Sequence, residues 1–170
     1  LLKWFGVWEA AATVQGVMNT SNCEGYTIEV FVPWSTLGIT EPAYYITYTP
    51  AFNHVESDGR EPERTWTGYP GKNLYSNTGF FWASNSGLHN PNDVKDELVM
   101  CDAGFEIDGH LDEEVWAQTQ PVTYSRADGD YSLASTSYLT DKGFYLGLTV
   151  KDKYVYYADT SVRAIGYNSG

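Results

Sequence analysis

The sequence predicts an all-β fold, an antiparallel β-sandwich of two sheets, and three observations support that prediction. Aromatic residues make up 16% of the 170 residues and charged residues only 19%, a composition typical of strand-rich domains. The 16 Gly and 7 Pro residues supply frequent turns. The apolar residues repeat with the period of two that strands show, rather than the helical period of about 3.6. At this length the chain fits one domain.

The first half of the chain has its clearest strand at residues 26–32, where every second side chain is Tyr, Ile or Val. Pro33 ends this strand, because proline has no backbone N–H to donate to a ladder. Residues 34–38 then fit one short helical turn. Further strands are expected at residues 3–15, 43–49 and 79–83, and the polar residues 53–65 are expected to form a solvated loop.

The second half contains a predicted β-hairpin. Residues 131–139 and 144–150 form its strands, and the polar turn ending at Gly143 connects them. The later strand is expected to be half-buried, because every second residue from Phe144 to Val150 is apolar. Further strands are expected at residues 104–107, 121–124 and 154–158.

The best linker candidate is the loop at residues 85–96, which contains Asn-Ser-Gly and Asn-Pro-Asn. We therefore divide the chain into residues 1–90, a linker at 91–103, and residues 104–170. Because Leu1 is not a methionine, we interpret the chain as a processed or trimmed piece. Cys23 and Cys101 allow either one disulfide or two buried thiols.

The net charge of −12 limits the partners that the chain is expected to have. So acidic a chain repels nucleic-acid phosphates and anionic membranes, and no Lys/Arg cluster offsets the repulsion. No apolar run of about 18 residues predicts a membrane-spanning helix, and the N-terminus lacks the pattern of a signal peptide. We therefore expect no nucleic acid and no membrane insertion.

Two groups of motifs resemble the two halves of one known family. Residues 105–116, Phe-Glu-Ile-Asp-Gly-His-Leu-Asp-Glu-Glu-Val-Trp, and the later strand at 144–152 resemble the first half of a family 9 carbohydrate-binding module or a close relative. Three other segments resemble the second half of such a module: residues 25–38, Thr-Trp-Thr-Gly-Tyr-Pro at 65–70 and Asn-Thr-Gly-Phe-Phe-Trp at 77–82. The matches cover most of the chain, but the halves occur in reverse order.

The resemblance implies a β-sandwich that clamps the end of a polysaccharide chain between aromatic side chains and holds structural calcium. The family's central strand and acidic loop would follow Gly170 and precede Leu1 in the family's order, and this sequence lacks them. The calcium ligands and part of the sugar cleft are therefore left without residues to provide them. Three arrangements would explain the order: a circular permutant, a cut through a tandem array, or a subunit that shares strands with neighbouring chains. The missing segment favours an array or a polymer.

One region combines the side chains that sugar recognition needs. Aromatic faces pack against the C–H side of a pyranose, and short polar groups satisfy its hydroxyls. Trp66 and Trp82 are the leading candidates for these faces, with Tyr69 and Asn73 at the rim. Packing at the sandwich edge is the alternative for both tryptophans.

The other tryptophans are expected to be structural. Trp4 and Trp8 would point the same way on a strand, and core packing is favoured over a binding platform for both. Trp116 is expected to fill the core beside a helical turn capped by Asp112. Trp34 is expected to fill the corner after the strand that Pro33 ends.

No catalytic constellation is evident, and we predict that the chain is not an enzyme. Glu29, Glu106 and Asp108 are candidate carboxylates for glycosidase chemistry, but nothing singles out a pair. No serine-nucleophile motif is present. A structural calcium, the one cofactor considered, would find clustered oxygens at residues 128–130 or 56–59.

We interpret the chain as a non-catalytic carbohydrate-binding module of an extracellular or cell-surface protein, with a polysaccharide or other glycan as its partner. The alternative is a structural or assembly repeat of a surface layer, adhesin or filament. Such a repeat would self-associate into a head-to-tail polymer by strand sharing between subunits. The many aromatic residues fit both interpretations, because they also build protein interfaces.

Overall fold

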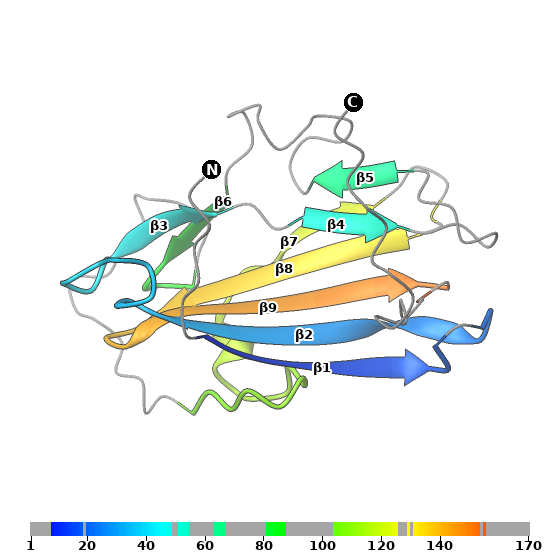
Figure 1. Cartoon of the computed structure of the whole chain (residues 1–170), viewed down its shortest axis with the longest axis horizontal. Helices are drawn as coiled ribbons and strands as arrows, with labels where there is room; N and C mark the ends of the chain where they lie inside the picture. Colours follow the sequence, from blue (N-terminus) through cyan, green and yellow to red (C-terminus); the bar gives the residue numbers. More distant parts are fainter. Residues whose placement is uncertain are drawn as a thin grey trace, which may run out of the picture.

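The computed structural model is an all-β fold made of antiparallel sheets (Figure 1). It describes residues 8–18, 20–48, 51–54, 63–66, 81–87, 104–125, 129, 131–153 and 155. The main sheet contains, in spatial order, β1 (Glu9–Gly16), β2 (Cys23–Pro33), β9 (Gly143–Asp152), β8 (Tyr131–Leu139) and β7 (Val122–Ser125). Two smaller pairs are β3 (Tyr45–Tyr48) with β6 (Phe81–Ser84) and β4 (Ala51–His54) with β5 (Glu63–Trp66). Among these residues no helix is long and apolar enough to cross a membrane.

The two halves of the sequence meet in the middle of the main sheet. β2, from the first half, pairs with β9, from the second, between Tyr26 opposite Val150 and Pro33 opposite Gly143. β1 continues the sheet beyond β2, while β8 and β7 continue it beyond β9. Figure 1 accordingly draws the blue β1 and β2 beside the orange β9 and yellow β8. The halves are therefore hydrogen-bonded to each other within one chain.

One face of the main sheet packs against the β3–β6 pair. A buried apolar cluster joins the two layers and consists of Trp34, Ala83, Leu139 and Phe144. The ring of Tyr48 on β3 lies 5.2 Å from that of Phe144, and its hydroxyl lies 3.0 Å from Ser135 Oγ on β8. This is the face that the alternating apolar residues of β9 predicted.

Residues 104–119 cover the opposite face of the main sheet. Phe105 stacks on Tyr145 with ring centroids 4.1 Å apart, and Trp116 meets the Phe105 ring edge-on at 4.9 Å. Phe144 and Tyr145 point to opposite faces of β9, yet each is only 6% exposed. The prediction that this strand is half-buried was therefore wrong, because the covering segment removes water from its second face.

Several predicted elements are confirmed. β8 spans the predicted residues, and β9 extends the predicted strand slightly at both ends. Pro33 is the last residue of β2, as its missing donor requires. Residues 34–38 form hydrogen-bonded turns, in which Leu37 N–H donates to Pro33 O at 3.3 Å. The predicted linker at 91–103 lies outside the described residues, as do most of residues 154–158.

Two expected elements differ from the structure. The predicted loop at residues 53–65 contains parts of two paired strands, β4 and β5, whose ladder satisfies backbone groups that a loop would leave to water. Residues 104–107 form no strand. Glu106 N–H donates to Glu113 Oε1 at 2.8 Å, so this donor is used within the covering segment instead of in a ladder.

The tryptophans divide between core and surface. Trp34 and Trp116 are 5% and 6% exposed and confirm the predicted core positions. Trp8 is 54% exposed, so the prediction that it packs in the core was wrong, and Trp4 lies outside the described residues. Asp112 does not cap the turn beside Trp116, since the 3-10 helix η2 (Trp116–Gln118) begins after Val115 and has no side-chain cap.

Candidate functional site

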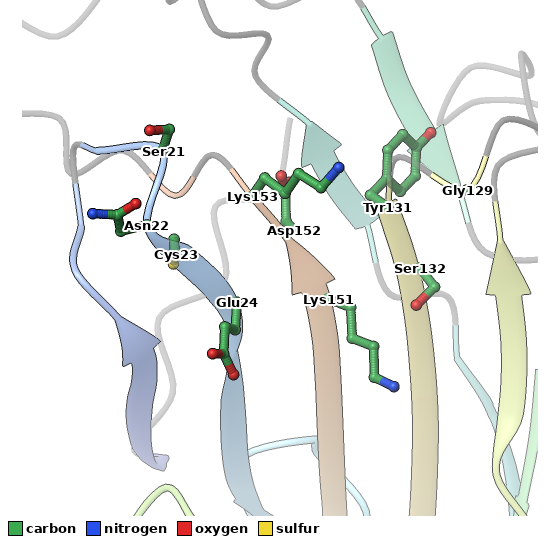
Figure 2. Close-up of a pocket in the computed structure, with 10 residues that line it drawn as sticks. All are labelled: Ser21, Asn22, Cys23, Glu24, Gly129, Tyr131, Ser132, Lys151, Asp152 and Lys153. Atoms are coloured by element: carbon green, nitrogen blue, oxygen red, sulfur yellow. The ribbon is translucent and has the colours of Figure 1, made fainter.

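A hollow with a volume of about 620 Å³ lies where β2 and β8 begin and β9 ends. Figure 2 shows that its walls come from the β1–β2 hairpin, the start of β8 and the end of β9. Sites for small ligands have volumes of about 300–1,000 Å³. The hollow is therefore large enough for a small polar molecule, and we call it the sheet-end hollow.

Three exposed charged side chains line the sheet-end hollow. Glu24 lies near the start of β2, whereas Lys151 and Lys153 lie at the end of β9 (Figure 2). Within the described part of the chain, none of the three makes a hydrogen bond or an ion pair. Ser132 lies opposite Lys151 in the β8–β9 ladder and adds a hydroxyl. These groups are available to a ligand.

Buried residues form the inner side of the sheet-end hollow. Cys23 and Asp152 are each 4% exposed, and Tyr131 is 1% exposed. Burial raises the pKa of the neighbouring Tyr26 to about 12, and the negative charge of Asp152 adds to this rise. Asp152 thus adds a buried carboxylate to the lining of the hollow.

The hairpin wall is held in place by its own hydrogen bonds. Val17 N–H donates to Asn22 O at 3.1 Å, and Thr20 Oγ1 donates to Val17 O at 2.7 Å while accepting from Asn22 N–H at 3.1 Å. The Cys23 thiol, which forms no disulfide, donates to Gln15 O at 3.3 Å. This wall is formed before any ligand arrives. Cys101, the other cysteine, lies outside the described residues.

Glu29 forms a second polar centre, which is completely buried. Its Oε2 accepts the N–H groups of Asp108 at 3.0 Å and Gly109 at 2.9 Å, and its Oε1 accepts the indole N–H of Trp116 at 3.0 Å. Burial raises the pKa of Glu29 above its ordinary value, although the three donors act in the opposite direction. We call this centre the Glu29 junction, because it fastens the covering segment to β2.

None of the three carboxylates considered for glycosidase chemistry lines the sheet-end hollow. Glu29 is 0% exposed and is occupied by three donors. Asp108 is exposed and accepts the N–H of His110 at 2.8 Å, which shapes the turn above the junction. Glu106 is exposed on the covering segment. Neither Asp108 nor Glu106 lines the sheet-end hollow.

A smaller hollow of about 320 Å³ lies beside η2 and is acidic, with Asp112, Glu113 and Glu114 among its residues. Within the described residues, no group of three or more His, Cys, Asp or Glu side chains is placed to hold a metal ion. The predicted calcium positions at 56–59, and the carboxylates of 128–130, lie outside those residues. Structural calcium therefore stays a prediction.

The predicted sugar-binding residues fall at the margins of the described chain. Trp66 is the last residue of β5, opposite Ala51, and Trp82 lies on β6, opposite Thr47. Their backbones therefore belong to different two-stranded sheets. Tyr69 and Asn73 lie outside the described residues. The assignment of all four residues stays a prediction.

Sequence analysis did not find the sheet-end hollow. Most of its residues lie outside the sequence motifs, and segments more than a hundred positions apart meet there only because β2 pairs with β9. One local signal was present, since Lys151 and Lys153 place two of ten basic residues at one strand end in an acidic chain.

No family model, curated protein or solved structure matches the chain.

Proposed function

We propose that this chain is a non-catalytic carbohydrate-binding module of an extracellular or cell-surface protein, with a β-sandwich of the family 9 type in permuted order. The observation that supports it most is the Glu29 junction. Glu29 belongs to the motif that resembles the family's second half, whereas Asp108, Gly109 and Trp116 belong to the motif that resembles its first half. Two motifs that meet around one buried carboxylate fit halves of a single domain.

A second link between the same halves supports the permuted arrangement. Trp34 follows β2, and its backbone N–H donates to Lys142 O at 3.1 Å in the β8–β9 turn. The indole N–H of Trp34 donates to Thr140 O in the same turn at 3.0 Å. A closed permutant requires contacts of this kind within one chain, so they favour it over a cut through an array.

In the proposed module, aromatic faces bind the sugar and polar groups at the rim orient it. Trp66 and Trp82 provide the faces, and Tyr69 and Asn73 provide the rim. A small, well-hydrated ligand gains little net free energy, so one module binds weakly. Several modules displayed together bind tightly, because binding of the first module raises the effective concentration of the polysaccharide at the others. The burial of Glu29 supports a non-catalytic role, because its carboxylate is committed to structure.

Affinity electrophoresis on a panel of soluble glycans tests the proposed function. We expect at least one polysaccharide to retard the unaltered chain, and expect Trp66→Ala or Trp82→Ala to reduce the retardation strongly. Trp8→Ala is the matched control, because this tryptophan is 54% exposed and lies outside the proposed site. Unretarded migration on every glycan would remove the proposed function.

The outer edge of β1 favours a second candidate function, assembly by strand sharing. β1 is the last strand on its side of the main sheet, and its eight residues carry one charged side chain, Glu9. Within the described residues no strand pairs with this edge, and exposed edges with few charges are templates for added strands. Sedimentation at increasing concentrations tests assembly, and a monomer at every concentration would rule it out.

A further inference from the structure

We infer that the sheet-end hollow is a binding site for a short, neutral saccharide. The inference rests on the proposed carbohydrate-binding function and adds a site distinct from Trp66 and Trp82. It depends on three features of the hollow: the balance of its charges, the hydrogen-bonding character of its free groups, and its pre-formed wall.

Among the described residues that line the hollow, positive and negative charges are equal in number. Lys151 and Lys153 supply two positive charges, and Glu24 and Asp152 supply two negative charges. An anionic ligand would meet Glu24 in a chain whose net charge is −12, and a cationic ligand would meet both lysines. A neutral ligand avoids both repulsions.

The free groups require a ligand that donates and accepts hydrogen bonds. The Glu24 carboxylate only accepts, whereas the Lys151 and Lys153 ammonium groups only donate. A hydroxyl does both, so the hydroxyls of a short saccharide can donate to Glu24 and accept from the lysines. Hydrogen bonds to charged groups are also stronger than those between neutral groups.

The geometry lowers the cost of binding. The hairpin wall is fastened by the bonds of Val17 and Thr20, and Ser132 is fixed beside Lys151 by the β8–β9 register. Binding therefore orders few groups apart from the two lysine side chains. The volume of about 620 Å³ lies within the range of known small-ligand sites. We expect a dissociation constant of about 1 mM, because each sugar hydroxyl exchanges bonds with water for bonds with protein.

An NMR titration of the ¹⁵N-labelled chain tests the inference. Neutral oligosaccharides should shift the backbone amides of residues 21–24, 131–132 and 151–153 in a saturable manner. Glu24→Gln and Lys151→Gln should each weaken this binding by about tenfold, since each removes a charge-assisted hydrogen bond. Lys142→Gln is the matched control, because Lys142 is an exposed lysine at the opposite end of β9 that pairs with Asp141. It should leave the affinity unchanged.

The same spectra separate this inference from the proposed function, because the indole N–H signals of Trp66 and Trp82 report on the other site. If neutral saccharides shift only these indoles, the function stands and the inference is overturned. If uronic-acid oligosaccharides or glycine shift the amide signals of the hollow and neutral saccharides do not, the inference of a neutral saccharide ligand is overturned. If no saccharide shifts any signal, both are overturned.

Discussion

Glu24 and Glu29 lie on the same strand, β2, but in contrasting surroundings. Glu29 is 0% exposed and accepts three N–H groups from the covering segment, whereas Glu24 is exposed and has no partner among the described residues. The segment at 104–119 covers the sheet at the Glu29 junction, and Glu24 lines the sheet-end hollow instead. Coverage by a distant segment, rather than residue type, decides which carboxylate stabilises the fold and which is free for a ligand.

Replacing each glutamate by alanine should give the largest contrast. Glu29→Ala leaves three donors without an acceptor in a buried position, so the free energy of unfolding should fall by about 3–5 kcal/mol. Glu24→Ala removes no contact and should leave the urea midpoint unchanged. Urea unfolding followed by tryptophan fluorescence measures both. Similar losses in the two variants would contradict the contrast between the regions.

Glycines in the two regions sharpen the comparison further. Gly109 and Gly129 have φ values of 92° and 74°, so alanine is strained at both. At Gly109 a Cβ would lie 2.8 Å from the carbonyl carbon of Ala12, whereas at Gly129 it would meet nothing within 4 Å. Gly109→Ala should cost about 2–4 kcal/mol and Gly129→Ala about 1 kcal/mol. Thermal unfolding measures the difference. Equal decreases in melting temperature for the two variants would contradict the prediction, because they would mean that the backbone around Gly109 accommodates a Cβ without loss of stability.

A pH series should show a smaller effect that belongs to the Glu29 junction alone. The pKa of Glu29 is raised in the folded state, so folding favours its protonated form. Its contribution to stability is full below the ordinary pKa of about 4.5 and is lost as the pH rises through the raised value. Compared with Glu29→Gln, which does not titrate, the unaltered chain should therefore be relatively more stable in acid.

The measurement for this prediction is the difference in unfolding free energy between the two proteins, from about pH 4 to about pH 7. Glu24→Gln serves as the control. A difference that instead grows in favour of the unaltered chain as the pH rises would show that the three donors outweigh burial.

Local pattern was sufficient to predict the strands of the main sheet that have strong alternation. β8 was predicted at its observed bounds, and the end of β2 followed from the missing donor of Pro33. Weaker patterns failed. Residues 104–107 have a strand-like composition but form no strand, and the backbone N–H of Glu106 donates to Glu113 Oε1 within the covering segment. Trp8 was expected in the core and is exposed, because an apolar side chain at a sheet edge is buried only if something covers it.

The sequence by itself determined that the chain is built of strands and where its main hairpin turns. These properties depend on side-chain alternation and turn residues, which act over a few positions. Only the tertiary structure decided that β2 pairs with β9, that Glu29 is buried, and that Glu24, Lys151 and Lys153 line one hollow. Burial and charge pairing are set by segments that are distant in sequence, so no local pattern contains them.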